Sequence, residues 1–95
     1  MNNPLFVIAK ITPKAEHFEQ AKTAITDIVE RTLEEGGCRQ FSVYQSDASL
    51  FLYEEWEDQA ALDEHYAMPY IAPVFEAYEE WLATPVEINK LSRLR

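Results

Sequence analysis

The stretch "CRQFSVYQSDASLFLYEEWED", residues 38–58, contains two runs rich in branched and aromatic residues, which are typical of β-strands. A short polar turn around Asp47 and Ala48 separates them, and this spacing favours an antiparallel hairpin. Side chains alternate between the two faces of a strand. One face of the second strand therefore carries Leu50, Leu52, Glu54 and Trp56, and the other carries Phe51, Tyr53, Glu55 and Glu57.

The segment before the hairpin predicts a strand that passes into a helix. Residues 5–12, "LFVIAKIT", have strand composition, and Thr12 and Pro13 are expected as the N-cap and first position of the helix. Gly36 and Gly37 are expected to end that helix. Its apolar stripe, at spacings of three and four, consists of Phe18, Ala21, Ile25, Ile28, Val29, Thr32 and Leu33.

The segment after the hairpin predicts two short helices and a last strand. Asp58 is expected to cap a helix from Gln59 to about Tyr66, after which Pro69 and Pro73 interrupt the chain. "VFEAYEEWL", residues 74–82, resumes a helical period, and "TPVEINKLSR", residues 84–93, is expected as a strand. The stripe of the second helix consists of Val74, Phe75, Tyr78, Trp81 and Leu82.

The resulting order is β-α-β-β-α-β, which predicts an α+β, ferredoxin-like fold with a four-stranded antiparallel sheet. The first and third strands should be central, and both are apolar on both faces. Helices can cover only one of those faces. A second copy of the sheet would cover the other, so we expect a homodimer.

Composition narrows the function classes further. The 95 residues predict one domain, residues 1–95, and a formal charge of −9 disfavours nucleic acids and anionic membrane surfaces as partners. Apolar runs are far shorter than the roughly 20 residues of a membrane helix, and the start lacks signal-peptide features. A single cysteine, Cys38, agrees with a reducing compartment. We therefore expect a cytoplasmic protein.

Few residues have the spacing of a chemical motif. With two glycines there is neither a P-loop nor a dinucleotide fingerprint, and His17 and His65 share no metal-ligand spacing. No metal site is expected, and Cys38 is interpreted as a small hydrophobic residue. The paired acidic residues at 34–35, 54–55 and 79–80 are interpreted as solvated faces, except Glu54, which shares a face with Trp56. His65 lies on the apolar side of its helix.

Two segments, "EEGGCRQFSVYQS" and "FLYEEWEDQAALDEHYAMPY", are similar to the antibiotic biosynthesis monooxygenase (ABM) family of dimeric α+β-barrel proteins. Met68 and Tyr70 depart from the pattern, since Ser or Thr and a second His are common there. The matching residues are Tyr53, Glu54, Trp56, Asp58, Ala61, Leu62, His65 and Pro69.

The resemblance implies a cavity between sheet and helices, and a dimer formed by sheets packed face to face. Some members oxygenate phenols or quinols without metal or flavin. The implied function is thus a cofactor-independent monooxygenase, an oxidoreductase acting on a small aromatic or quinone-like molecule. His65 is the implied base and Trp56 the ring-stacking donor. The implied substrate pocket consists of Glu54, Tyr66, Tyr70 and Phe75.

Of three other functions, one is argued against and two stay open. A haem-degrading branch of the family pairs the Trp and His with an Asn on the first strand, but Phe6, Val7 and Ile8 stand there, which argues against haem. A phospho-autoinducer isomerase needs phosphate recognition, which the charge of −9 disfavours. A non-catalytic ligand-binding or stress-associated dimer is the remaining alternative.

Overall fold

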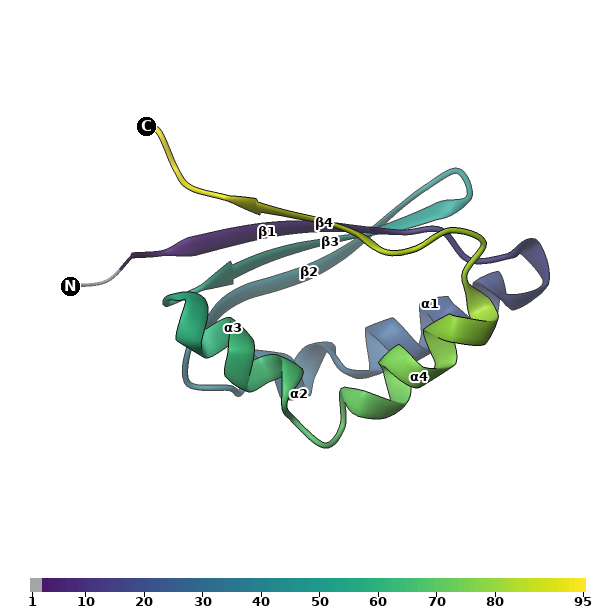
Figure 1. Ribbon diagram of the computed structural model, residues 1–95, viewed down its shortest axis with the longest axis horizontal. Coiled ribbons are helices and arrows are strands. Elements are labelled where there is room, and N and C mark those ends of the chain that lie inside the picture. Colours follow the sequence, from purple (N-terminus) through teal and green to yellow (C-terminus); the bar gives the residue numbers. More distant parts are fainter. Residues whose placement is uncertain (1–2) are drawn as a thin grey trace.

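The computed structural model describes residues 3–95, which form a four-stranded antiparallel sheet with helices on one face (Figure 1). The strands lie in the order β2-β3-β1-β4, so β1 and β3 are central. This confirms the predicted ferredoxin-like βαββαβ fold and its strand placement. The strands are β1 (Leu5–Ile11), β2 (Cys38–Ser46), β3 (Ser49–Trp56) and β4 (Glu87–Leu91).

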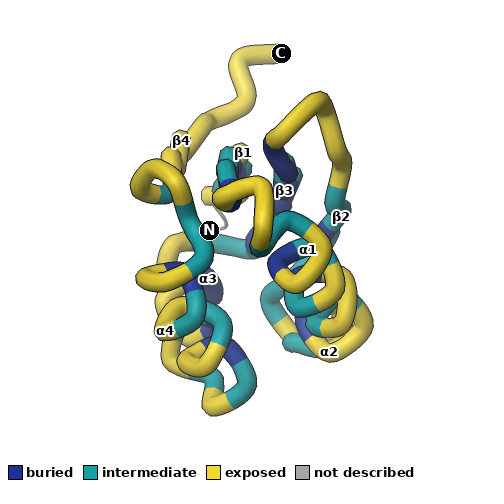
Figure 2. Tube along the Cα trace, turned by 90° about the vertical axis from the view of Figure 1, so that its right-hand side faces the viewer, coloured by how far each residue is buried: buried dark blue, intermediate teal, exposed yellow. Residues whose placement is uncertain are grey.

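The helices pack beneath the sheet as two pairs. The first crossover holds a 3₁₀ turn (Ala15–His17), α1 (Phe18–Asp27) and α2 (Val29–Leu33); the second holds α3 (Gln59–Tyr66) and α4 (Ala72–Trp81). Figure 2 shows buried positions on the strands and helices that face each other, while β4 and the C-terminal residues are exposed. The core therefore lies between the central strands and the helices.

Alternation along the central strands builds this core as the sequence predicts. Val7, Ala9 and Ile11 of β1 are buried beside Leu50 and Leu52 of β3, because residues two apart share one face. Ala21 and Ile25 of α1 and Leu62 of α3 are also buried. Apolar burial on this one face is the main stabilising contribution.

The start of the first helix differs from the prediction that Thr12 is its N-cap and Pro13 its first residue. Lys14 is the residue before the helical turn, and its backbone is extended. Pro13 instead forms a β-bridge with Leu82, and the Thr12 carbonyl accepts a hydrogen bond from Ala83 N–H. The Thr12 hydroxyl lies 2.8 Å from that of Ser49. These tertiary bonds hold Thr12 and Pro13 in an extended conformation.

The predicted single helix is also interrupted at Ile28. Its backbone, at φ −93° and ψ −4°, separates α1 from α2, and its N–H bonds to Ile25 in a tighter turn. Leu33, in the short helix that follows this interruption, is 46% exposed although it lies on the predicted apolar stripe. Thr32 remains fully buried.

The turns around the hairpin follow the predicted chemistry. Asp47 has a φ of 51°, a left-handed conformation that Asp tolerates in tight turns. Asp58 caps α3, since its carboxylate accepts the Ala61 N–H at 2.9 Å. Gly37 is needed for a close approach: a Cβ there would lie 2.4 Å from the Cβ of Ala61.

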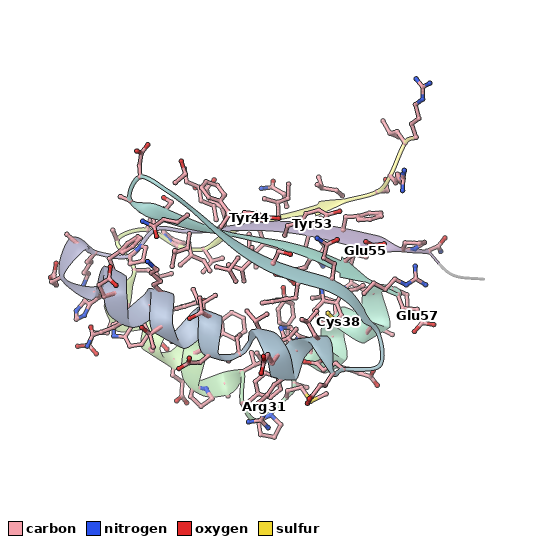
Figure 3. All side chains as sticks on the ribbon, turned by 180° about the vertical axis from the view of Figure 1, so that it is seen from behind. Arg31, Cys38, Tyr44, Tyr53, Glu55 and Glu57 are labelled. Atoms are coloured by element: carbon pink, nitrogen blue, oxygen red, sulfur yellow. The ribbon has the colours of Figure 1, made fainter. Side chains whose placement is uncertain are left out.

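The outer face of the sheet carries apolar and aromatic side chains that no helix covers. Tyr44 and Tyr53 lie on this side, away from the helices, whereas Cys38 lies on the inner side (Figure 3). Tyr44 is 57% exposed and Ile8 is 38% exposed.

Among the helices of residues 3–95, none combines the length and apolar character of a membrane span.

Candidate functional site

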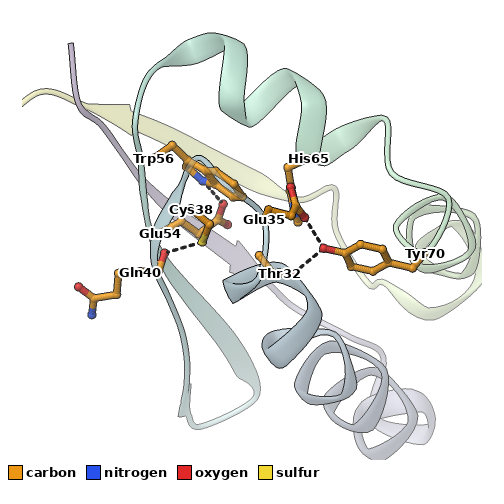
Figure 4. Close-up of polar contacts among 8 residues, drawn as sticks. All are labelled: Thr32, Glu35, Cys38, Gln40, Glu54, Trp56, His65 and Tyr70. Carbon is orange, nitrogen blue, oxygen red and sulfur yellow. Dashed lines mark hydrogen bonds and ion pairs between the residues drawn. The ribbon is translucent and has the colours of Figure 1, made fainter. Parts of the chain in front are cut away.

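A buried carboxyl group on β3 is held by a neighbouring tryptophan. Glu54 and Trp56 share the inner face of the sheet, and the Trp56 indole Nε1–H donates to Glu54 Oε1 at 2.9 Å (Figure 4). Glu54 is 4% exposed. Burial raises the pKa of Glu54 to about 7, and the hydrogen bond from Trp56 opposes that rise only in part. Near neutral pH, Glu54 can therefore both hold and release a proton.

Glu54 lines a small cavity of about 40 Å³ between the sheet and α4. Tyr66 and Phe75 line it too, so three of the four residues predicted for the pocket meet there, and Tyr70 does not. Tyr78 also lines the cavity. The sequence placed Tyr78 on the apolar stripe of its helix but did not predict it as a pocket residue. Within residues 3–95, Glu54 is the one charged side chain in the lining, and the rest is mostly apolar.

The charge of Glu54 contributes to the raised pKa of both tyrosines that line the cavity. Burial, then the charges of Glu54 and Asp63, raise the pKa of Tyr66 to about 12. Burial and the charge of Glu54 raise the pKa of Tyr78 as well. Both phenols thus keep their protons at neutral pH and remain hydrogen-bond donors near the carboxyl group.

His65 projects from α3 into the interior, on the apolar side that the sequence predicts. It is 4% exposed, and its ring lies against Trp56 with centroids 4.7 Å apart. Its Nδ1 lies 2.7 Å from Glu35 Oε2. Because an ionised carboxylate only accepts hydrogen bonds, Nδ1 carries the proton of this bond.

Glu35 overturns the interpretation of residues 34–35 as a solvated acidic pair. Its side chain is only 9% exposed and accepts hydrogen bonds from His65 and from the Tyr70 hydroxyl (Figure 4). The Tyr70 oxygen also lies 3.2 Å from that of Thr32. The turn after α2 carries Glu35 towards α3, a long-range contact that no local spacing reveals.

Trp56 connects the two ionisable groups of the site. Its N–H bonds to Glu54, and its ring packs against His65. Neither His65 nor Trp56 lines the cavity itself. Tyr66 bridges the two regions, since its ring lies 5.7 Å from that of His65 and also lines the cavity. The predicted site residues thus form one cluster with two parts.

Neither a metal site nor a reactive Cys38 is expected from the sequence. Within the described part of the chain, no cluster of three or more His, Cys, Asp or Glu side chains has the arrangement of a metal site. Cys38 is half-buried, and its Sγ donates to the Gln40 carbonyl at 3.6 Å. Burial, with the charges of Glu35 and Glu54, raises the pKa of Cys38 to about 11, which makes it a poor nucleophile.

Most of the chain matches one protein family. The profile described as "Antibiotic biosynthesis monooxygenase" (ABM) matches residues 4–77. This chain belongs to the ABM family. The match includes Glu35, Glu54, Trp56, His65 and Tyr70, and members of the family are typically dimeric.

Individual relatives support the same assignment. The chain is 29% identical to the Mycobacterium tuberculosis protein named "Putative monooxygenase Rv0793" over 99% of this chain and 95% of that one. The structure of Rv0793 superposes with a TM-score of 0.92 over 97% and 96% of the two chains. A Pseudomonas aeruginosa protein, PA3566, is 30% identical with a TM-score of 0.92, covering 100% of this chain and 98% of that one.

Proposed function

We propose that this ABM-family protein is a cofactor-independent monooxygenase of a small phenol or quinol that binds in front of Glu54. The observation that carries the proposal is a buried carboxyl group with a pKa of about 7 in the wall of an otherwise largely apolar and aromatic cavity. Apolar walls suit the ring system of such a substrate, and the carboxylate suits its hydroxyl group.

Glu54 would act first, by accepting the phenolic proton. A group whose pKa is near the working pH is well matched to this task. The resulting electron-rich anion reacts with O₂ directly: a C–O bond forms at a ring carbon that carries hydrogen, and the peroxide takes the proton back from Glu54. The hydroperoxide then loses water, together with the hydrogen of that carbon, to leave a carbonyl group. Tyr66 and Tyr78 remain protonated, so they can donate to the charge that develops on oxygen.

His65 enters the proposal as a second proton acceptor. The family resemblance implies the role of base for His65, but its ring lies beside that of Tyr66 and does not line the cavity. A substrate that displaces the Tyr66 ring would come within reach of the imidazole. Trp56 supports both acceptors, by donating to Glu54 and by packing its tilted ring against His65.

The cavity has to widen before a ring system fits. Its volume of about 40 Å³ is far below the roughly 300–1,000 Å³ of typical ligand sites. Phe75 is 39% exposed and Ile88 is 43% exposed, and both line the cavity. Because these side chains have room to turn outward, we propose that substrate enters between α4 and β4.

The alternative functions differ in what the cavity must hold. A phosphorylated metabolite is poorly matched, since Glu54 is the one charged lining group in residues 3–95 and would repel phosphate. A non-catalytic binding protein would use the same cavity but consume no oxygen. Oxygen uptake therefore separates this alternative from the proposal.

The test is oxygen uptake with a panel of hydroxylated naphthalenes and anthrones. We expect Glu54→Gln to lower kcat by about 10²- to 10⁴-fold, the usual contribution of a general base, and to abolish an acidic limb centred near pH 7 in the wild-type profile. His65→Gln should lower the rate less while keeping that limb.

The matched control is Glu64→Gln, since Glu64 is exposed on α3 beside His65. This variant should turn over like wild type. Loss of the pH limb in His65→Gln but not in Glu54→Gln would transfer the role of base to His65. Tight binding of a panel compound without any oxygen uptake would favour the non-catalytic alternative and overturn the proposed reaction.

A further inference from the structure

We infer that Glu35 and Tyr70 are positioning residues for His65, which hold its imidazole in the Nδ1–H tautomer and leave Nε2 as the proton-accepting nitrogen. The assignment of the tautomer stands on geometry alone. Its consequence for turnover rests on the proposed function, in which His65 is a proton acceptor.

The hydrogen bond to Glu35 sets the tautomer. Glu35 follows α2 and His65 lies near the end of α3, yet Nδ1 is 2.7 Å from Glu35 Oε2 in a region where both side chains are at most 9% exposed. The nitrogen of a neutral histidine that carries the proton is set by the partner of the ring. A carboxylate at Nδ1 therefore requires the proton there and leaves the lone pair on Nε2.

Tyr70 fixes the carboxylate in turn. Its hydroxyl donates to the same Oε2 atom that accepts from His65, so Glu35 is held from two sides. Thr32, fully buried on α2, lies 3.2 Å from the Tyr70 oxygen. The Arg31 guanidinium lies 4.4 Å above the Tyr70 ring and adds a cation–π contact. Glu35 is therefore preorganised before any ligand binds.

The other side of the imidazole is aromatic. Phe41 and Trp56 lie against the ring, with centroids 5.9 Å and 4.7 Å away. Neither presents a hydrogen-bond donor to Nε2, since Phe41 has none and the Trp56 N–H is used by Glu54. Every buried side-chain nitrogen and oxygen in the described residues has a partner, so the unbonded Nε2 retains some accessible surface. Nε2 thus keeps its lone pair, which a ligand that displaces the Tyr66 ring would meet.

The test uses ¹⁵N NMR of the histidine rings, in which the two neutral tautomers have different nitrogen shifts and couplings. Wild type at a pH where His65 is neutral should show the proton on Nδ1. Glu35→Ala should move the population towards Nε2–H, and Tyr70→Phe should move it in the same direction but less. In the double variant, the two shifts in tautomer population should not be additive, because Tyr70 acts through Glu35.

Glu34→Ala is the matched control, because Glu34 is the exposed neighbour of Glu35; it should leave the His65 spectrum unchanged. An unchanged tautomer in a folded Glu35→Ala protein would overturn the inference. With a substrate in hand, Glu35→Ala should lower kcat on the order of tenfold with little change in KM, as when the orienting partner of a histidine is lost. Absence of oxygen uptake in wild type would contradict the proposed function and leave the tautomer result standing.

Discussion

Glu54 is buried, whereas glutamate side chains are usually exposed to water. A carboxylate in a largely apolar wall loses its hydration, and one hydrogen bond from Trp56 does not compensate fully. The folded protein therefore binds a proton on Glu54 that the unfolded chain releases more easily. A group of this kind costs stability at neutral pH, which is a common compromise at functional sites.

Glu54→Gln should remove a pH dependence of stability. Below about pH 4.5 Glu54 is protonated in both states; as pH rises towards the folded pKa of about 7, the unfolded chain ionises first, so the free energy of unfolding falls. The pKa difference corresponds to about 3 kcal/mol. Compared with wild type, the variant should therefore gain up to about 3 kcal/mol between about pH 4 and pH 8.

Urea unfolding of both proteins across that range measures this difference. Other titrating groups are common to the two proteins and cancel in the comparison. Parallel stability curves for wild type and Glu54→Gln would show that the carboxyl group keeps an ordinary pKa in the folded protein.

At the scale of elements, the turn between α2 and β2 positions the site. It places Glu35 against α3, and it depends on the close approach of Gly37 to Ala61. The backbone N–H of Glu57 also bonds to the Gly37 carbonyl at 2.8 Å, which joins this turn to the end of β3. The turn with Glu35, strand β3 with Trp56 and helix α3 with His65 therefore meet at Gly37.

Gly37→Ala should destabilise the protein by about 1–3 kcal/mol, since the added Cβ would lie 2.4 Å from that of Ala61 and force α3 away. Gly36→Ala is the control: a Cβ added there would have no other atom within 4 Å, and the φ of Gly36 is not positive, so the change should be close to neutral. Thermal or urea unfolding compares the two. Equal stability of both variants would contradict the role of Gly37.

At the scale of the whole molecule, the sheet has one covered and one open face. The open face carries aromatic and aliphatic side chains on the central strands, and Lys10 lies 5.8 Å from the ring centre of Phe51. Members of the family are typically dimeric. We propose that a second copy of this chain covers the open face. Its apolar residues are Phe6, Ile8, Tyr44, Phe51, Tyr53 and Leu91.

Sedimentation equilibrium should give twice the chain mass of 11.0 kDa at micromolar concentration. Ile8→Glu places a charge in the middle of the open face and should shift the mass towards that of one chain, because a buried unpaired charge is costly. Thr23→Glu, an added charge on an exposed position of α1, should remain dimeric. A wild-type mass near that of one chain would rule out the dimer.

The order of elements, the central place of β1 and β3, the hairpin turn and the Asp58 cap were all predictable from the sequence. Each depends on residues close together in the chain: the two-residue period of Leu50 to Trp56, or a carboxylate three residues before the N–H that it caps. The same period placed Glu54 beside Trp56, and helical spacing placed His65 on the inner face of α3.

Tertiary structure alone decided which polar groups became partners. Thr12 and Pro13 have the local pattern of a helix start, but bonds to Ala83, Leu82 and Ser49 keep them extended. Glu34 and Glu35 look alike in sequence, yet only Glu35 reaches a histidine thirty residues away. The physical reason is that local periods determine the face on which a side chain lies, whereas its neighbours across that face depend on how the helices pack on the sheet.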